Sequence, residues 1–303
     1  MNNTLYQFLI SKVPKDCVKT DEPMAAHTTF RVGGPADFFV EIGSLKELRE
    51  IIDYLHKTDY DFFVLGNGSN LLVGDKGYQG VVLHLGHRFA DYSIEGNVVT
   101  AQAGAMLSVV AKAAAGDSLT GMEFAAGIPG TIGGAIVMNA GAYDGEMKQI
   151  VTKVTVMTGE GEVLELDNET MEFGYRTSVI KNRPFIVLSA QMTLKKGNAE
   201  EIHAKIEELN ARRRSKQPLE LPSAGSTFKR PEGHFAGKLI MDAGLRGSRI
   251  GGAQVSEKHC GFIVNLGNAS AADIYELMEE VAEKVEDQFS VRLEPEVVRL
   301  GDF

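Results

Sequence analysis

The sequence predicts an α+β protein built from three modest domains. Its 303 residues are enough for two or three domains of ordinary size. A strand–helix–strand segment comes first. Several strands follow, two of them close enough in sequence to form a hairpin, and the last third of the chain combines helices with short strands. Hydrophobic residues make up 44% of the chain and charged residues 24%, as in ordinary globular proteins.

The first part of the chain predicts a pair of parallel strands. Ala36–Ile42 and Phe62–Leu65 are strands by composition. Ser44 opens a helix between them that runs to Lys57, and Glu47 is its capping-box partner. Because a helix connects the two strands, we expect them to run in parallel.

The middle of the chain predicts a mixed region with a hairpin. Strands are expected at Val81–Leu85, Val98–Ala103, Val151–Met157, Val163–Leu166 and Phe185–Leu194, and a helix at Met106–Ala115. Two glycines lie between the third and fourth of these strands, which favours a hairpin there.

The last part predicts helices around short strands. Helices are expected at Ala199–Arg214, Ala236–Ala243 and Ala271–Phe289, and strands at Ser226–Lys229, Gln254–Val255, Phe262–Val264 and Val291–Leu293. Ser270 and Asp273 form a capping-box pair at the start of the last helix.

Charge and targeting patterns argue against several classes of protein. The net charge of −10 argues against a general nucleic-acid binder, which needs a basic surface. The N-terminus has no signal-peptide pattern, and the uncharged run from Phe124 to Tyr143 holds too many glycines for a membrane span. The two cysteines, Cys17 and Cys260, suit a reducing compartment. We therefore expect a cytosolic protein that binds neither nucleic acid nor membrane.

Glycine is concentrated in one window of the chain. Of 33 glycines, 16 fall between Gly66 and Gly145, which is one residue in five. One cluster there is GNGSNLLV, Gly66–Val73, at the end of a predicted strand. Its glycines permit positive φ, and consecutive backbone N–H groups in such a turn can bind an anion. An ordinary tight turn explains the same residues equally well.

A second cluster, GIPGTIGGA, spans Gly127–Ala135. It leads into a helical segment that starts near Thr131, and a helix N-terminus can hold an anion through its N–H groups and dipole. The cluster lacks the Gly-Lys-Ser/Thr ending of a P-loop, and neither cluster fits the Gly-x-Gly-x-x-Gly dinucleotide pattern. The two turns suit a pyrophosphate held from two sides, or they are structural turns only.

Three further motifs carry side chains that could bind or react. GYRTS contains Arg176, whose planar guanidinium suits a carboxylate or phosphate. SAGSTFKRP contains Ser226 after a glycine that could expose its hydroxyl, and EPEVVRLG contains Glu296. Each motif alone has an ordinary surface explanation. No metal site is indicated, because no group of ligand-type residues has the spacing of one.

Together these motifs resemble a known family. TTFRVGGPAD, GNGSNLLV, GIPGTIGGA, NAGAYDGE, GYRTS, GSTFKRP, GGAQVSEKH and LEPEV follow one another as in UDP-N-acetylenolpyruvoylglucosamine reductases. The resemblance implies the two-subdomain FAD-binding fold of the vanillyl-alcohol-oxidase-like (PCMH-type) class, followed by a smaller α+β substrate-binding domain. It implies FAD-binding subdomains at 1–80 and 81–196 and a substrate domain at 197–293. Residues 294–303 are expected to return to the first subdomain.

The resemblance also implies a reaction and its catalytic residues. NADPH would reduce FAD, and flavin N5 would pass a hydride to C3 of the enolpyruvyl group of UDP-N-acetylglucosamine enolpyruvate. The product would be UDP-N-acetylmuramate for peptidoglycan. Arg176 would pair with the substrate carboxylate, and Ser226 would protonate C2. Glu296 would act beside Arg176 as a hydrogen-bonding acid.

The same resemblance assigns the binding residues. FAD would be held by Gly66, Asn67, Gly68, Ser69, Asn70, Leu71, Gly127, Ile128, Pro129, Gly130, Thr131, Gly133, Gly134 and Ala135. The substrate would be contacted by Tyr175, Lys229, Arg230 and Lys258.

The sequence departs from one branch of this family. That branch carries an insertion after the GYR-x-S motif, with a tyrosine that closes over the substrate. Here six residues separate Ser178 from Phe185, and Arg230 stands where that branch has asparagine, so the chain resembles the shorter, second type.

Two other functions stay open from the sequence. One is an FAD oxidase on the same fold, and the other is a nucleotide-sugar-binding regulator without catalysis. The sequence does not separate NADPH from NADH, and it leaves the oligomeric state open, with a monomer favoured.

Overall fold

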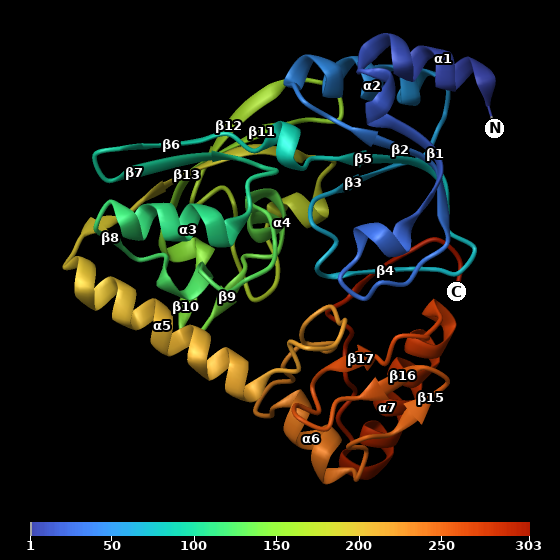
Figure 1. The fold of residues 1–303 in the computed structure, drawn as a ribbon, viewed down its shortest axis with the longest axis vertical. Helices are drawn as coiled ribbons and strands as arrows, with labels where there is room; N and C mark the ends of the chain where they lie inside the picture. The colour runs from blue at the N-terminus through green and yellow to red at the C-terminus, as the bar shows by residue number, and fades with distance from the viewer. Residues whose placement is uncertain (1) are drawn as a thin grey trace. The chain divides into compact units, whose positions relative to one another are not determined.

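The chain folds into two compact units, drawn in Figure 1. The structure, a computed structural model, describes residues 2–303. The first unit contains the chain up to Thr20, Phe38–Asn67 and Gly80–Arg213, and the second contains Asp21–Asp37, Gly68–Gln79 and Arg214–Phe303. The N-terminal part of the chain therefore contributes to both units. The division into three domains at residues 80, 196 and 293 stays a prediction.

The elements within residues 2–303 mix helices and strands throughout. The helices are α1 Asn3–Lys12, α2 Leu45–Lys57, α3 Leu107–Gly116, α4 Ile132–Val137, α5 Ala199–Lys216, α6 Ala236–Asp242 and α7 Ala271–Phe289. The first strands are β1 Val18–Pro23, β2 Pro35–Glu41, β3 Phe62–Leu65, β4 Leu71–Val73, β5 Tyr78–His84, β6 Tyr92–Glu95, β7 Val98–Gln102, β8 Leu119–Thr120 and β9 Gly141–Ala142. The later strands are β10 Gly145–Glu146, β11 Val151–Met157, β12 Val163–Asp167, β13 Ile186–Thr193, β14 Lys195–Lys196, β15 Arg249–Ile250, β16 Ala253–Val255, β17 Ile263–Asn265 and β18 Val298–Leu300.

The predicted strand–helix–strand segment forms β2, α2 and β3. These strands belong to a sheet of order β1-β2-β5-β3. β5 therefore lies between β2 and β3, the two strands that were predicted to be parallel. β3 and β5 run in parallel. Ser44 caps α2 by accepting from the Glu47 N–H at 3.2 Å, as expected. The Glu47 carboxylate instead accepts from the Gly43 N–H, one residue before the expected partner.

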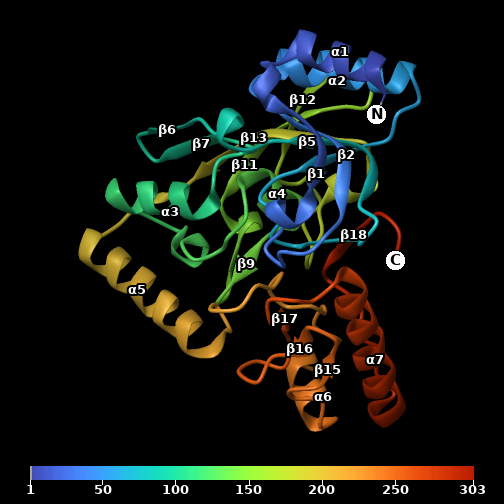
Figure 2. The same cartoon turned by 45° about the vertical axis from the view of Figure 1, so that its right-hand side comes forward.

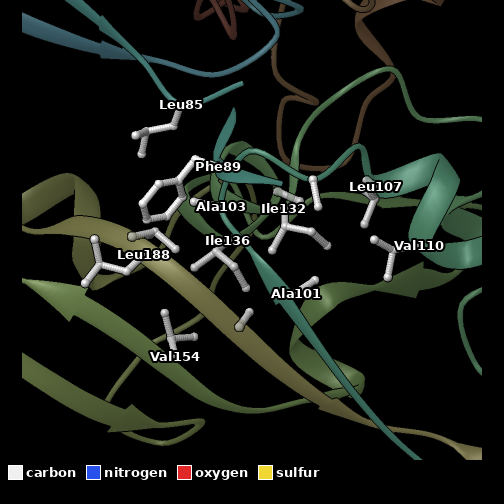
Figure 3. Close-up of a cluster of buried hydrophobic side chains, with 14 of the residues drawn as sticks. Leu85, Phe89, Ala101, Ala103, Leu107, Val110, Ile132, Ile136, Val154 and Leu188 are labelled. Carbon is white, nitrogen blue, oxygen red and sulfur yellow. The ribbon is translucent and has the colours of Figure 1, made fainter. Parts of the chain in front are cut away.

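A five-stranded antiparallel sheet forms the centre of the first unit. Its order is β12-β11-β13-β7-β6, which confirms the predicted hairpin of β11 and β12. Helix α4 packs on β13 and β7. Figure 3 shows Ile132 and Ile136 of α4 among Ala103, Leu188 and Phe89. Both isoleucines are 0% exposed, and each such burial contributes about 1.5–3 kcal/mol.

The second unit is built around α7 and the sheet β15-β16-β17 (Figure 2). The expected strands at Ser226–Lys229 and Val291–Leu293 are wrong. Phe228 instead makes one isolated bridge to Pro295, through the Lys229 N–H to Glu294 O and the Glu296 N–H to Thr227 O. The last strand is β18, which pairs in parallel with β4 inside the 1–80 range.

The uncharged run from Phe124 to Tyr143 folds around the six-residue helix α4. Glycine and proline end the helical conformation on its N-terminal side. Across residues 2–303, the helices are too short or too polar to cross a membrane.

Candidate active site

The start of the first glycine cluster, Gly66 and Asn67, belongs to the first unit and lies beside the second cluster there, whereas Gly68–Val73 belong to the second unit. Asn67 Nδ2 donates to the Pro129 carbonyl at 2.5 Å. A Cβ placed on Gly66 would come within 2.5 Å of Thr131 Oγ1, so a side chain at Gly66 would separate the turns. Asn67 and Pro129, which are 62 residues apart in the sequence, are therefore in direct contact within the first unit.

A cavity of about 430 Å³ opens beside these turns. Its lining residues are Asn67, His84, Gly86, His87, Ala90, Tyr92, Gly104, Ala105, Met106, Val109 and Thr131. Asn67 and Thr131 supply polar groups, whereas Met106 and Val109 supply apolar surface. The cavity therefore combines hydrogen-bonding groups with apolar surface, as small-molecule sites do.

Sequence reasoning missed two of the segments that line the cavity, the one after β5 and the one after β7. They touch through their backbones, because the Gly104 N–H donates to Phe89 O at 2.9 Å. A Cβ on Gly104 would lie 2.3 Å from Gly86 O. Both glycines belong to the glycine-rich window, and that excess was the signal that could have found them.

The first turn offers backbone donors. Among the described residues, the N–H groups of Asn67, Gly68 and Ser69 donate no hydrogen bond. Gly68 has φ of +58°, which is the left-handed conformation that glycine adopts readily. Adjacent N–H groups in such a turn form the concave donor site expected for an anion.

The second turn differs from the expectation. The first three N–H groups of α4 donate to Ala105 O at 2.8 Å, Ala103 O at 2.8 Å and Thr131 Oγ1 at 3.4 Å. The idea that this helix N-terminus presents free donors was wrong for these three groups. Carbonyl groups of the segment between β7 and α3 accept hydrogen bonds from two of these N–H groups, and the side chain of the N-cap residue accepts from the third.

Helix α5 anchors the second turn from outside. The Arg213 guanidinium donates to the Gly127 carbonyl and forms a side-chain hydrogen bond with Tyr143. Burial lowers the pKa of Arg213 below its ordinary value, because desolvation disfavours the charged form. The Arg212 guanidinium lies over the Tyr143 ring, 4.7 Å from its centroid. Both ends of the segment between Gly127 and Tyr143 are thus held by one helix.

Arg176 lies in a tight turn of the first unit. Its backbone has φ of +55°, and its Nη2 donates to the Gly141 carbonyl at 3.4 Å. Its guanidinium lies 5.3 Å from the centroid of the Tyr175 ring, which is 54% exposed. Val179–Asn182 form a 3-10 helix directly after the motif, so β13 follows without an inserted loop.

The segments of Ser226 and Glu296 meet in the second unit. Gly225 has φ of +78°, and the exposed Ser226 follows it. The next residue, Thr227, is 0% exposed, and its carbonyl accepts from the Glu296 N–H at 2.8 Å. Asn70 Nδ2 donates to the Glu296 carbonyl at 3.0 Å. Backbone bonds therefore fix the two predicted catalytic residues relative to each other.

The predicted substrate-contact residues fall in both units. Tyr175 belongs to the first unit, with Arg176, and the three cationic residues belong to the second, with Ser226. Lys229 Nζ lies 3.0 Å from Glu294 Oε2, and Lys258 Nζ donates to Arg214 O at 2.8 Å. The Arg230 guanidinium lies over the Phe235 ring, 4.6 Å from its centroid.

Comparison with known proteins decides the family. Residues 217–300 match the family described as UDP-N-acetylenolpyruvoylglucosamine reductase, C-terminal domain, and residues 36–167 match an FAD binding domain. A UDP-N-acetylenolpyruvoylglucosamine reductase of Lachnoclostridium phytofermentans is 50% identical over 306 residues, covering 100% of this chain and 99% of the relative. The chain belongs to the UDP-N-acetylenolpyruvoylglucosamine reductase family.

Solved structures agree with this family. The crystal structure of UDP-N-acetylenolpyruvylglucosamine reductase from Thermus caldophilus matches with a TM-score of 0.80 and 36% identity, over 92% of this chain and 97% of that one. Phl p 4.0202, a glucose dehydrogenase, matches with a TM-score of 0.51 and 13% identity, over 65% of this chain and 45% of that one, and shows the fold alone.

These matches confirm several expectations from the sequence. The fold is the predicted two-subdomain, PCMH-type FAD-binding fold followed by a smaller α+β domain. As a member of the UDP-N-acetylenolpyruvoylglucosamine reductase family, the protein is an oxidoreductase, and its FAD-binding domain makes it a flavoprotein. The roles of individual residues stay predictions.

Proposed function

We propose that this chain reduces the enolpyruvyl group of UDP-N-acetylglucosamine enolpyruvate to UDP-N-acetylmuramate, with NADPH as the reductant, as a cytosolic step of peptidoglycan synthesis. The observation that carries the proposal is the match of 100% of the chain to a relative named for this reduction. FAD supplies the hydride for C3 of the vinyl group when it is bound and reduced. The chain's own side chains bind the substrate, stabilise charge and supply the proton.

The two glycine turns hold FAD in this proposal. Gly66–Leu71 contributes the backbone donors of the first turn, and Gly127–Ala135 contributes further contacts to the cofactor. Support comes from the contact between Asn67 and Pro129 and from the cavity that both turns line. The helix dipole of α4 adds a favourable field for phosphate, although its first N–H groups are used within the chain.

Arg176 stabilises the charge that develops during the reaction. When a hydride reaches C3, the electron pair of the vinyl bond moves to C2 and spreads into the carboxylate. A guanidinium that donates two parallel hydrogen bonds to that carboxylate lowers the energy of this state. The half-buried position of Arg176 supports the role, because less water competes for its donors.

Ser226 donates the proton to C2. The new C–H bond forms as the O–H bond of the serine breaks, and the exposed oxygen recovers a proton from water. Serine is a weak acid, but a strongly basic carbanion needs only a proton held in line. Support comes from the buried Thr227, which keeps the backbone at Ser226 fixed.

Glu296 acts beside Arg176 as a hydrogen-bonding acid. Its backbone is held by the Thr227 carbonyl and by Asn70, so its side chain starts from a fixed position. Tyr175, Lys229, Arg230 and Lys258 contact the substrate. In the free protein, Lys229 pairs with Glu294 and Lys258 with Glu220. When the substrate binds, each lysine contacts a phosphate oxygen in place of its glutamate.

Ser226→Ala tests the assignment of the proton donor. Rapid mixing measures two steps separately: flavin reduction by NADPH, and reoxidation of the reduced flavin by the enolpyruvyl substrate. We expect the first step to stay within about 2-fold of the wild type and the second to fall by about 100-fold or more. Ser223→Ala, three residues earlier in the same loop, is the matched control and should leave both steps unchanged. Equal loss of both steps in Ser226→Ala would show that this serine is not the proton donor.

A further inference from the structure

Asn139 is a buried polar residue without a role in the reaction proposed above. It follows the C-terminal end of α4, it is 1% exposed, and its backbone has φ of +42°. Its Nδ2 donates to Glu146 Oε2 at 3.0 Å and to the Gly174 carbonyl at 3.0 Å. Its Oδ1 accepts from the Lys148 N–H at 2.9 Å. A buried amide with three hydrogen bonds fixes the backbone that it contacts.

The bond to Gly174 ties this amide to the turn that carries Arg176. Gly174 and Thr177 exchange two backbone hydrogen bonds, of 3.1 and 3.4 Å, which close the turn around Arg176. The Arg176 side chain then reaches the Gly141 carbonyl, on the hairpin that follows Asn139. The arginine is therefore held at its backbone and at its guanidinium by the same short segment.

Helix α4 connects this segment to the predicted cofactor turn. Its N-cap is Thr131 of the second glycine cluster, and its C-terminal end carries the Val137 carbonyl, which accepts from Ser178 Oγ at 3.0 Å. The helix has six residues, which corresponds to about 9 Å. A short, rigid element thus sets the distance between the surface assigned to FAD and the arginine turn.

Asn168 provides a matched comparison within the same unit. Its Nδ2 donates to the Lys148 carbonyl at 2.8 Å and to the Val151 carbonyl at 2.7 Å. It supports the loop at Lys148 as Asn139 does, but within residues 2–303 its hydrogen bonds do not reach residues 174–177. Asn168 therefore controls for support of the Lys148 loop without the contact to the arginine turn, although it is half-buried and does not share the positive φ of Asn139.

From this geometry we propose that Asn139 is a positioning residue, which holds Gly174 so that the Arg176 guanidinium stays aimed at the substrate carboxylate. The inference rests on the proposed role of Arg176. Misplacing a group that stabilises the transition state by about 1 Å costs on the order of 100-fold in rate. Loss of the Gly174 bond should therefore slow the step that uses Arg176 and spare the others.

Two substitutions at Asn139 distinguish the effect of its side-chain hydrogen bonds from the effect of its backbone conformation. Asn139→Asp keeps the shape and the acceptor for Lys148, but it places an oxygen opposite both the Gly174 carbonyl and the Glu146 carboxylate. Asn139→Gly removes the amide and keeps the backbone conformation, because glycine tolerates positive φ. Asn168→Asp and Asn168→Gly are the matched controls. Arg176→Ala is the reference for complete loss of the arginine.

The measurement compares the two half-reactions, using NADPH and UDP-N-acetylglucosamine enolpyruvate as the probes. We expect both Asn139 variants to slow reoxidation of the flavin by the substrate by about 10- to 100-fold through kcat, with KM changed by less than about 2-fold. Flavin reduction by NADPH and the amount of bound FAD should match those of the Asn168 variants, under conditions where urea unfolding shows every variant to be fully folded.

Three results distinguish the possible failures. If the folded Asn139 variants slow both half-reactions equally, or lose FAD beyond the controls, the residue is structural and the inference is overturned. If Arg176→Ala slows reoxidation and the Asn139 variants do not, the inference alone fails. If Arg176→Ala leaves reoxidation unchanged, the proposed role of Arg176 fails as well.

Discussion

The absence of a side chain at Gly66 allows Thr131 to pack closely against its backbone. A Cβ there would overlap Thr131 Oγ1, and one on Gly104 would overlap the Gly86 carbonyl. Gly145 is similar, since its Cβ would fall 2.5 Å from the Phe124 ring. The glycine-rich window therefore reflects segments of the chain that approach one another closely, in addition to any ligand.

Gly66→Ala tests whether this contact supports the cofactor turn. The added methyl group would push the first turn away from Thr131, and overpacking of this kind costs about 1–3 kcal/mol in the free energy of unfolding. We also expect weaker retention of FAD on dialysis. Gly116→Ala at the end of α3 is the control, because a Cβ there meets nothing within 4 Å. A Gly66→Ala protein as stable as the wild type, with FAD fully retained, would contradict this account.

Single residues of the site could be predicted where a motif names them, and their partners could not. Asn67 and Thr131 stand in motifs, but only the folded chain shows that their turns touch. Asn70 was assigned to the cofactor, and its side-chain amide donates to Glu296, 226 residues away. Asn139 stood in a quoted motif without a role, because its function depends on what a buried amide contacts.

At the scale of elements, the N-terminus of α7 shows how local signals succeed. Ser270 and Asp273 form the predicted capping box. The Asp75 carboxylate adds bonds to the N–H groups of Ala271 and Ala272, at 2.7 and 2.9 Å. The box involves neighbours in sequence and was predictable, whereas the partner from 196 residues away was not.

Asp273→Asn tests the capping box through its dependence on pH. Hydrogen bonds from the Ser270 and Gly252 N–H groups lower the pKa of Asp273 below its ordinary value. A carboxylate with a lowered folded-state pKa adds stability above the unfolded value of about 3.9, and this contribution is lost as pH falls through the folded value. Because solvent screens this partly exposed group, we expect a loss of about 1 kcal/mol at pH 7, typical of a cap.

Urea unfolding of the wild type and the variant between pH 7 and pH 3 measures this effect. The difference in the free energy of unfolding should shrink as pH falls below about 4 toward the lowered folded-state value, because the unfolded chain then binds a proton that the folded Asp273 does not. Asp287→Asn, at the other end of α7, is the control and should not destabilise, because a negative charge near a helix C-terminus is unfavourable. A difference for Asp273→Asn that stays constant with pH would contradict the assignment.

Strand predictions failed where pairing comes from far along the chain. Residues 226–229 and 291–293 have strand-like composition, but the strand-type pairing of the first region is one isolated bridge, from Phe228 to Pro295 just after the second region. β18 was missed because its three residues become a strand only by pairing with β4. Long amphipathic helices such as α2 and α7 can be predicted from the spacing of their own apolar residues. Short strands cannot, because their formation depends on the strand with which they pair.

At the scale of the whole molecule, the residues predicted for the cofactor and for the substrate are each spread over both units. The cavity and Arg176 belong to the first unit, and Ser226 and Glu296 belong to the second. The family relationship extends over both, since the reductase of Lachnoclostridium phytofermentans aligns with 100% of the chain. The order of motifs along the sequence was enough to predict that relationship, although no single motif was.

The central claim is that one protein passes reducing equivalents from NADPH through FAD to the enolpyruvyl sugar nucleotide. The most direct test follows the flavin absorbance band of the purified protein without oxygen, first with NADPH and then with UDP-N-acetylglucosamine enolpyruvate. We predict that NADPH bleaches the band and that the sugar nucleotide restores it. The amount of UDP-N-acetylmuramate formed should equal the amount of flavin reoxidised. A bleached flavin that ignores the sugar nucleotide and recovers only with oxygen would contradict the account and indicate an oxidase. A colourless protein that cannot be reconstituted with FAD would contradict it as well.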